Sequence, residues 1–335
     1  MDIELQTSFN EFSVMAVWSA IALYLLAFLA FAYDLSQRAS PTPAKQRKPV
    51  LVGAEGGPSP AAQNGAGEES LRVSGAERSR RYFARLGIAF TVLGFTLHLA
   101  ATVTRGIAAE RVPWANMYEF ALIGTLLIVA VYLVALRWYD LRFLGVFIVG
   151  MVVFFLGGST MSFYVEVTPL MDPLKSVWLI IHVFVASLAT ALFALAAGLS
   201  TMQLLQARRE RIKAGGGVEV APDRGYLRTL PKAEALETLA YRFAILGFIF
   251  WTFTLIAGAI WANDSWGRYW GFDVKEVWTF VIWVIYAGYI HARATRGWRG
   301  TRSAWLSLVG FAAVIFNFTI VNLFFKGLHA YSGIS

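Results

Sequence analysis

Residues 258–293 read GAIWANDSWGRYWGFDVKEVWTFVIWVIYAGYIHAR, a polar and aromatic centre between two apolar runs. The run before the centre covers 240–262, and the run after it covers 277–292. Because a helix needs about 20 mainly apolar residues to cross a bilayer, the pattern predicts a membrane-spanning helix for each run. The stretch 266–278 contains four charged side chains, which a span does not tolerate, so 263–276 is predicted to be a loop at the membrane surface.

The composition of the whole chain indicates an integral membrane protein. Of its 335 residues, 57% are hydrophobic and 15% are charged, whereas a soluble domain carries about 25% charged residues. We therefore predict an all-α polytopic membrane protein of about eight transmembrane helices, a multi-pass protein of the cell (plasma) membrane. The predicted spans are 13–33, 84–104, 117–136, 143–161, 176–204, 240–262, 277–292 and 304–326.

The apolar runs also suggest a division of the chain. The first span is expected to be retained rather than cleaved as a signal peptide, because its flank carries Asp2 and Glu4 in place of basic residues. Residues 34–83 are rich in Pro, Gly, Ala and Ser and lack apolar periodicity, which is typical of a disordered linker. We predict a first transmembrane helix (1–33), a disordered cytoplasmic linker (34–83) and a seven-helix core (84–335).

Lysine and arginine are distributed unevenly between the two sides of the predicted spans. Of the 29 basic residues, 23 fall on one side and 6 on the other. Cytoplasmic loops carry the excess of Lys and Arg in membrane proteins, so the basic side is predicted to be cytoplasmic. An even number of spans then places both termini, and the loop 263–276, on the outer face. The predicted cytoplasmic segments are 34–85, 137–142, 206–242 and 293–302.

Net charge and cysteine content limit the possible partners. The net charge of +8 is explained by the cytoplasmic segments, so we expect membrane lipid around the chain and no nucleic-acid partner. The sequence contains no cysteine, which excludes disulfides, thiolate metal sites and thiol redox chemistry within this chain. Any thiol chemistry must therefore belong to a partner protein.

Two of the four histidines lie near the predicted outer face. His182 is about 10 Å below the outer start of its span, and His329 follows the last span on the same side. Two imidazoles beside an aromatic loop would suit a flat, apolar, iron-bearing ligand such as haem, which takes axial imidazoles, aromatic walls and charges for its propionates. The alternatives are that the histidines are hydrogen-bonded packing residues and that the aromatic residues anchor the loop at the membrane interface.

Other polar residues leave alternatives open. Asp273, Lys275 and Glu276 form either a local ion-pair network or contacts to haem propionates. His291 ends span seven at the cytoplasmic side, where it is either an interfacial residue or an axial ligand for haem that arrives from inside. His98 lies nearer the outer face than His291, so a haem shared by the two looks strained, and packing is the favoured interpretation of His98.

Several motifs in order resemble the CcsA (ResC) family, the WWD-domain haem-handling subunit of the System II cytochrome c synthase. WGRYWGFDVKEVW within 258–293 resembles the family's tryptophan-rich signature, and VPWANMYEF at 112–120 is similar to its Pro-x-x-Asn-x-Tyr-Glu segment. LKSVWLIIHV at 174–183 and GLHAYSG at 327–333 resemble the segments that carry its two external histidines. The resemblance covers 84–335, which is essentially everything after the predicted linker.

This resemblance implies a function in cytochrome c biogenesis. Haem b, as substrate, would be held on the outer face by His182 and His329 as axial ligands, with His291 as a ligand during transit. It would then be attached to the Cys-x-x-Cys-His segment of apocytochrome c, as in a holocytochrome c synthase (haem lyase). The implied partners are a ResB/CcsB-type membrane subunit, the apocytochrome and, indirectly, a thioredoxin-like reductant. The remaining implied haem contacts are Trp266, Tyr269, Trp270, Phe272, Asp273, Lys275, Glu276 and Trp278.

Two departures from the family pattern and two rival functions remain. The family usually has Trp-Asp-Pro-Lys-Glu, where this chain has Phe272 and Val274 in place of Trp and Pro. Phe keeps an aromatic face but lacks the indole N–H, and Val does not fix the backbone as Pro would.

One rival function is a haem exporter or chaperone without attachment activity. The other is a transporter for a different solute, which internally repeated halves would support, and no internal repeat is visible.

Overall fold

The computed structural model of the chain describes residues 2–39, 60–167, 170, 172–215, 226–295, 297–325 and 327–328. The described residues form eight long α-helices and one short one, so the all-α prediction is confirmed for this part of the chain. The helices are α1 (Ile3–Ala39), α2 (Pro60–Ala109), α3 (Met117–Ala135), α4 (Gly145–Ser162), α5 (Val177–Ala214), α6 (Ala233–Trp266), α7 (Val274–Thr295), α8 (Thr301–Phe318) and α9 (Ile320–Phe324). Short 3-10 turns cover Arg142–Leu144, Asp172–Lys175 and Tyr226–Thr229.

Seven of the helices are long and apolar enough to cross a membrane, and the chain is a multi-pass membrane protein. They are α1 to α6 and the continuous pair α8 and α9. The remaining long helix, α7, has 22 residues, about 33 Å at 1.5 Å per residue. Charged residues at both of its ends shorten its apolar middle, so its crossing of the membrane stays a prediction, as does the side on which the termini lie.

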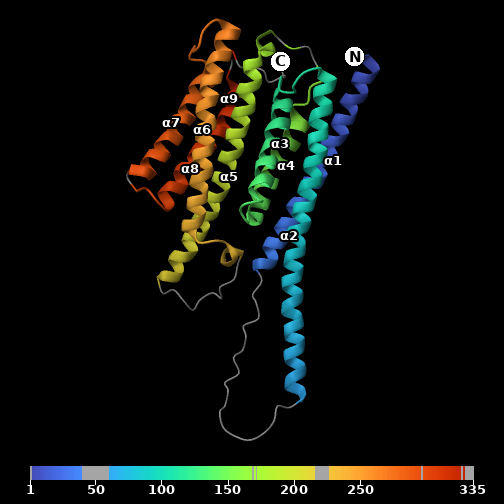
Figure 1. The fold of residues 1–335 in the computed structure, drawn as a ribbon, viewed down its shortest axis with the longest axis vertical. Coiled ribbons are helices and arrows are strands. Elements are labelled where there is room, and N and C mark those ends of the chain that lie inside the picture. Colours follow the sequence, from blue (N-terminus) through green and yellow to red (C-terminus); the bar gives the residue numbers. More distant parts are fainter. Residues whose placement is uncertain are drawn as a thin grey trace.

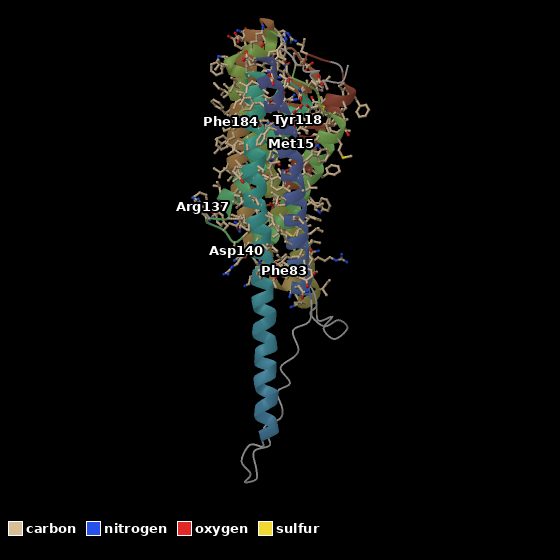
Figure 2. All side chains as sticks on the ribbon, turned by 90° about the vertical axis from the view of Figure 1, so that its right-hand side faces the viewer. Met15, Phe83, Tyr118, Arg137, Asp140 and Phe184 are labelled. Atoms are coloured by element: carbon tan, nitrogen blue, oxygen red, sulfur yellow. The ribbon has the colours of Figure 1, made fainter. Side chains whose placement is uncertain are left out.

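The helices pack as two groups that meet along α5. Within the first, α1 lies against α2 and α4, and α3 lies against α4; within the second, α5 lies against α6 and α8, and α7 against α8. Contacts between α3 and α5 join the groups (Figure 1). We call the end of the bundle at which α1, α3, α5 and α7 begin the upper end, as it is drawn in Figure 1. Figure 2 shows Tyr118 toward the upper end, with Arg137 and Asp140 near the opposite end.

Close helix packing depends on small residues that face large ones. The ring of Phe31 in α1 lies between Gly87 of α2 and Gly145 at the start of α4, where a Cβ would come within 2.8 and 2.7 Å of the ring. In the second group, the Phe193 ring of α5 stacks on Tyr286 of α7, with centroids 3.7 Å apart and planes at 9°. All three large side chains are buried, which fixes the spacing of the helices.

The region predicted to be a linker is only partly described. Residues 34–39 belong to α1 and residues 60–83 to α2, whose first turns extend beyond the bundle (Figures 1 and 2). Residues 40–59 lie outside the described residues. The division of the chain into a first span, a disordered linker and a seven-helix core therefore stays a prediction.

Candidate functional site

A cavity of about 210 Å³ lies near the upper end of the bundle between α3, α5, α6 and α8. Its walls are mainly apolar and aromatic, and a few polar side chains point into it, which is the usual character of a small-molecule site. Trp114, which precedes α3, and Tyr269 and Trp270, which follow α6, line it toward the upper end. The cavity therefore lies beside the loop for which the sequence predicted ligand binding.

His182 of α5 lines this cavity in a fixed orientation. Its Nδ1 lies 2.9 Å from the carbonyl oxygen of Thr254 in α6, and its ring is nearly parallel to that of Trp261, with centroids 5.8 Å apart and planes at 22°. Because a carbonyl only accepts, Nδ1 carries the proton, and the imidazole lone pair is on Nε2. This arrangement, in which the second ring nitrogen donates to a backbone carbonyl, is the usual one for histidines that bind metals.

The close approach of α6 to His182 requires Gly258. A Cβ at this position would lie 2.7 Å from Cε1 and 2.8 Å from Nδ1 of the imidazole. The ring therefore fits between Gly258 and Trp261 only because residue 258 has no side chain.

The loop between α6 and α7 is built around two carboxylates. Asp273 caps α7, since its Oδ2 accepts from the Lys275 N–H at 3.3 Å. Glu276 reaches back, and its Oε2 accepts from the Asp273 N–H at 3.1 Å and from the Gly271 N–H at 2.8 Å. This reciprocal pair is a capping box, with Asp as the N-cap and Glu at the third helical position. The two carboxylates thus bind backbone N–H groups of the loop, and contact with a ligand stays a prediction.

The Glu276 carboxylate also fixes the backbone of Phe272 in an unusual conformation. Glu276 binds the N–H groups on both sides of this residue, whose φ is +58°, a left-handed value rare for residues other than glycine. The Phe272 side chain is 79% exposed and does not line the cavity. Trp266 and Trp278 do not line the cavity either: Trp266 packs behind the lining residue Trp261, and Trp278 packs on Phe316.

Lys275 lines the cavity, as does Glu276, whereas Asp273 does not. The Lys275 Nζ donates to Oδ1 of Asn322 in α9. Burial lowers the pKa of Lys275 to about 8, and the nearby charge of Asp273 acts in the opposite direction. Among the described residues that line the cavity, Lys275 is the one cation, and it lies just before the predicted span 277–292.

Among the described histidines, His291 and His98 do not line this cavity. His329 lies outside the described residues, but the preceding Leu328 donates its N–H to Asp273 Oδ1 at 3.0 Å, so the chain passes the start of α7 just before His329. His291 is exposed in the last turns of α7, about 24 Å along the helix from Lys275. His98 is fully buried beside Tyr24, whose hydroxyl lies 3.3 Å from His98 Nδ1, as expected for a packing residue.

The predicted site residues that meet at the cavity are His182, Tyr269, Trp270, Lys275 and Glu276. The sequence analysis did not single out Trp114 or Gly258 as parts of the wall. Trp114 had a readable signal, because Asn116 and Glu119 have the spacing of a helix cap, and the cap fixes the chain just before it. No local signal marks Gly258, which is defined only by the helix that packs against it.

Comparison with known proteins places these features in a family. A sequence profile described as Cytochrome C assembly protein matches residues 114–329. The Cytochrome c biogenesis protein CcsA of Synechococcus sp. (strain JA-3-3Ab) is 32% identical over 295 residues, which cover 74% of this chain and 86% of that protein. CcsA of Guillardia theta is 33% identical over 263 residues, with coverage of 73% and 85%.

The fold also resembles a solved structure. The structure of Cytochrome c Heme Lyase CcmF superposes with a TM-score of 0.60 at 16% identity. The match covers 92% of this chain and 46% of that chain, so this chain corresponds to about half of the longer protein. At this identity the likeness shows the fold alone.

Proposed function

The chain belongs to the cytochrome c assembly protein family, and from this membership we propose that it binds haem in the cavity beside His182 and presents it to an apocytochrome c. Haem supplies the reactive vinyl groups. Each thiol of the apocytochrome Cys-x-x-Cys-His segment adds across one of them, so that an S–C bond forms and the thiol proton ends on the other vinyl carbon. The contribution of this chain is to hold and orient the two substrates.

The observation that carries the proposal is the geometry of His182. A hydrogen bond to Thr254 and the stacked Trp261 fix its ring, and the lone pair is on Nε2 of a side chain that lines an aromatic cavity. Neutral imidazole is the common axial ligand of haem iron. The donor type, its orientation and the aromatic walls all fit a flat iron porphyrin.

Lys275 is the residue we assign to a haem propionate. It is half-buried, lines the cavity and lies beside aromatic residues, and a cation there would pair with a carboxylate of the ligand. Asp273 and Glu276 instead shape the loop, because their oxygens accept its backbone N–H groups. Only one of the three charged residues in this part of the loop is thus proposed to contact haem.

The second axial ligand in this proposal is His329. Its support is the family resemblance together with the bond from Leu328 to Asp273, which brings the preceding residue to the loop beside the cavity. The histidine of the apocytochrome would replace one of the two imidazoles, and this exchange would release the product. His291 is proposed as a ligand for haem in transit from the cytoplasmic side.

The proposal requires partners and a defined orientation. Since the chain has no cysteine, another protein must keep the apocytochrome thiols reduced, and we assign this to a thioredoxin-like reductant. A ResB/CcsB-type membrane subunit would complete the synthase. The 23-to-6 distribution of basic residues supports an upper end on the outer face, eight crossings and both termini outside.

The test is the visible spectrum of the protein purified with its membrane partner. We expect a low-spin haem spectrum that weakens in His182→Ala and in His329→Ala and recovers when imidazole is added. His98→Gln is the matched control, because this histidine lies away from the cavity and its change should leave the haem spectrum unaltered. An unchanged haem spectrum in the His182→Ala variant would rule out the proposed site.

Covalent attachment is tested separately by co-expression with an apocytochrome c. Haem-stained cytochrome that depends on His182 and His329 supports a role in the synthase. Haem bound to this chain without any covalent product, in the presence of the partner, would instead favour the exporter or chaperone.

A further inference from the structure

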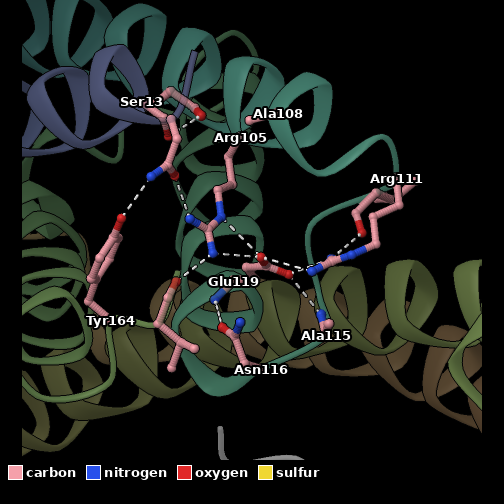
Figure 3. A network of polar contacts seen from close by, with 12 residues as sticks. Ser13, Arg105, Ala108, Arg111, Ala115, Asn116, Glu119 and Tyr164 are labelled. Carbon is pink, nitrogen blue, oxygen red and sulfur yellow. Dashed lines mark hydrogen bonds and ion pairs between the residues drawn. The ribbon is translucent and has the colours of Figure 1, made fainter. Parts of the chain in front are cut away.

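A buried ion cluster lies next to the cavity without lining it. Glu119 of α3 is fully buried and pairs with Arg105 of α2 at 3.0 Å and with Arg111 at 2.7 Å, and Arg105 is also fully buried (Figure 3). Charges this deep are stabilised only when their hydrogen-bonding groups are satisfied. Here every nitrogen of the Arg105 guanidinium donates, so this arginine is held through all three of its nitrogen atoms.

Glu119 also binds the backbone that forms the cavity wall. Its Oε2 accepts from the Ala115 N–H at 2.9 Å, and its own N–H donates to Oδ1 of Asn116 at 2.9 Å (Figure 3). Arg111, at the other end of this short segment, donates to both carboxylate oxygens. Ala115 lies between Trp114 and Asn116, which both line the cavity, so one carboxylate fixes this part of the wall.

Arg105 connects the same carboxylate to distant segments. It donates to Oδ1 of Asn10 in α1 at 2.6 Å and to the carbonyl of Val165, which follows α4, at 2.7 Å. Asn10 in turn donates to the hydroxyl of Tyr164 at 3.0 Å. The position of the wall therefore depends on helices that do not themselves contact the cavity.

We propose that Glu119, held by Arg105 and Arg111, is a positioning residue that fixes Trp114 and Asn116 in the wall of the cavity, and that Asn10 extends this control to α1. The inference rests on the proposed function for the identity of the ligand but not for the position of the wall. Glu119 itself touches no ligand in this account, and its effect is transmitted through the backbone of residues 114–116.

The first test uses a single cysteine, because the chain has none of its own. Met117→Cys places a thiol at a cavity-lining position that is 4% exposed, and its rate of reaction with a maleimide in detergent measures how well the wall excludes the reagent. We expect Glu119→Gln to raise this rate about tenfold and Asn10→Ala to raise it about threefold. Without these contacts the segment 114–116 should open locally more often and expose the thiol at position 117.

The matched control is Glu237→Gln. Glu237 forms a similar buried pair with Arg293 at 3.2 Å and binds the Gly300 N–H at 2.8 Å, and it lies about 21 Å along α6 from the nearest cavity residue of that helix, Trp251. Its substitution removes the same charge and should leave the labelling rate unchanged. Equal increases in Glu119→Gln and Glu237→Gln would show general loosening and overturn the proposal, as would unchanged rates in both Glu119→Gln and Asn10→Ala.

The second test is spectroscopic. Glu119→Gln should lower the His182-dependent haem absorbance several-fold, and Glu119→Asp should restore part of it, whereas Glu237→Gln should keep the parent spectrum. If Glu119→Gln does not fold, Asn10→Ala decides the question, because Asn10 is only partly buried and lies outside the cavity. If the His182→Ala variant has the same haem spectrum as the parent protein, the proposed function alone is overturned. The thiol labelling still decides whether Glu119 fixes the position of the wall.

Discussion

At the scale of single residues, the orientation of His182 depends on a missing side chain in the neighbouring helix. Gly258→Ala would place a methyl group 2.7 Å from the imidazole, a distance that forces either the ring or α6 to move. We expect the variant to retain several-fold less haem than the parent, as measured by the Soret absorbance of the purified protein.

Gly124 provides the control for this change. It lines the same cavity, but a Cβ there would have no neighbour within 4 Å. Gly124→Ala should therefore keep the parent absorbance. Equal losses in the two variants would mean that cavity volume, rather than the orientation of His182, determines haem retention.

Lys275 gives a prediction in which pH acts on folding and binding in opposite directions. Its pKa falls from 10.5 to about 8 on folding, so between these values the unfolded chain binds more protons than the folded one. The stability of the ligand-free protein should therefore rise as pH increases from 8 toward 10. Haem retention should fall over the lower part of the same range, because Lys275 loses the charge that would pair with a propionate.

Lys275→Met is the variant that isolates both effects. It should abolish the rise in thermal stability between pH 8 and 10 and weaken haem retention at pH 7 by several-fold. If Lys275→Met retains haem as well as the parent at pH 7, the propionate assignment is wrong, whatever the stability profile shows.

At the scale of elements, the start of α7 is determined by local chemistry. Val274 occupies the first helical position, where the family usually has proline and where the N–H has no partner within the helix. Val274→Pro should therefore be tolerated and should stabilise the protein by about 0.4–1 kcal/mol, because proline restricts the unfolded chain. Thermal unfolding of the ligand-free protein measures this gain.

The contrasting variant is Val277→Pro. The Val277 N–H donates to the Asp273 carbonyl at 3.0 Å, so proline there removes the first hydrogen bond of α7. A loss of about 3 kcal/mol or more is expected for proline inside a helix. Similar stabilities for the two proline variants would contradict the assignment of Asp273 as the N-cap.

The helices were predictable because apolar runs identify them, and seven of the eight predicted spans correspond to described helices that are long and apolar enough to cross a membrane. The limits of α7 were less clear, since Lys275 and Glu276 read as loop residues although they form its first turn. The Asp-x-x-Glu spacing was a readable cap signal, but its aromatic surroundings favoured a ligand-binding interpretation. Local patterns thus predicted the elements better than the roles of the residues at their ends.

At the scale of the whole molecule, the cavity was not predictable from any single segment. Trp114, His182, Gly258 and Lys275 come from four separate parts of the chain, and the packing of α3, α5, α6 and α7 around one space brings them together. The sequence did predict that His182 and the aromatic loop lie at the same end, because span counting and charge bias act over the full chain. What it lacked was the distance between helices, which depends on pairs such as Gly258 and His182.

The orientation of the whole molecule can be tested with the same cysteine-free background. Single cysteines at Tyr269, which is 61% exposed beside the cavity, and at Trp138, which is 71% exposed at the opposite end of α3, report the two faces. In intact cells, an impermeant maleimide should label Tyr269→Cys, whereas Trp138→Cys should react only after the membrane is opened. The reverse pattern would place the upper end in the cytoplasm, where the proposed attachment to an exported apocytochrome would be impossible.

A cysteine at Trp298, between α7 and α8, decides whether α7 crosses the membrane. Tyr269 and Trp298 flank α7, so a crossing requires that they react from opposite sides. We expect Trp298→Cys to behave like Trp138→Cys, because Arg293, Arg299 and Arg302 surround it and basic loops stay in the cytoplasm. If Trp298→Cys instead reacts in intact cells together with Tyr269→Cys, α7 does not cross. The chain then has seven spans, its termini lie on opposite sides, and His291 is not available to haem that arrives from the cytoplasm.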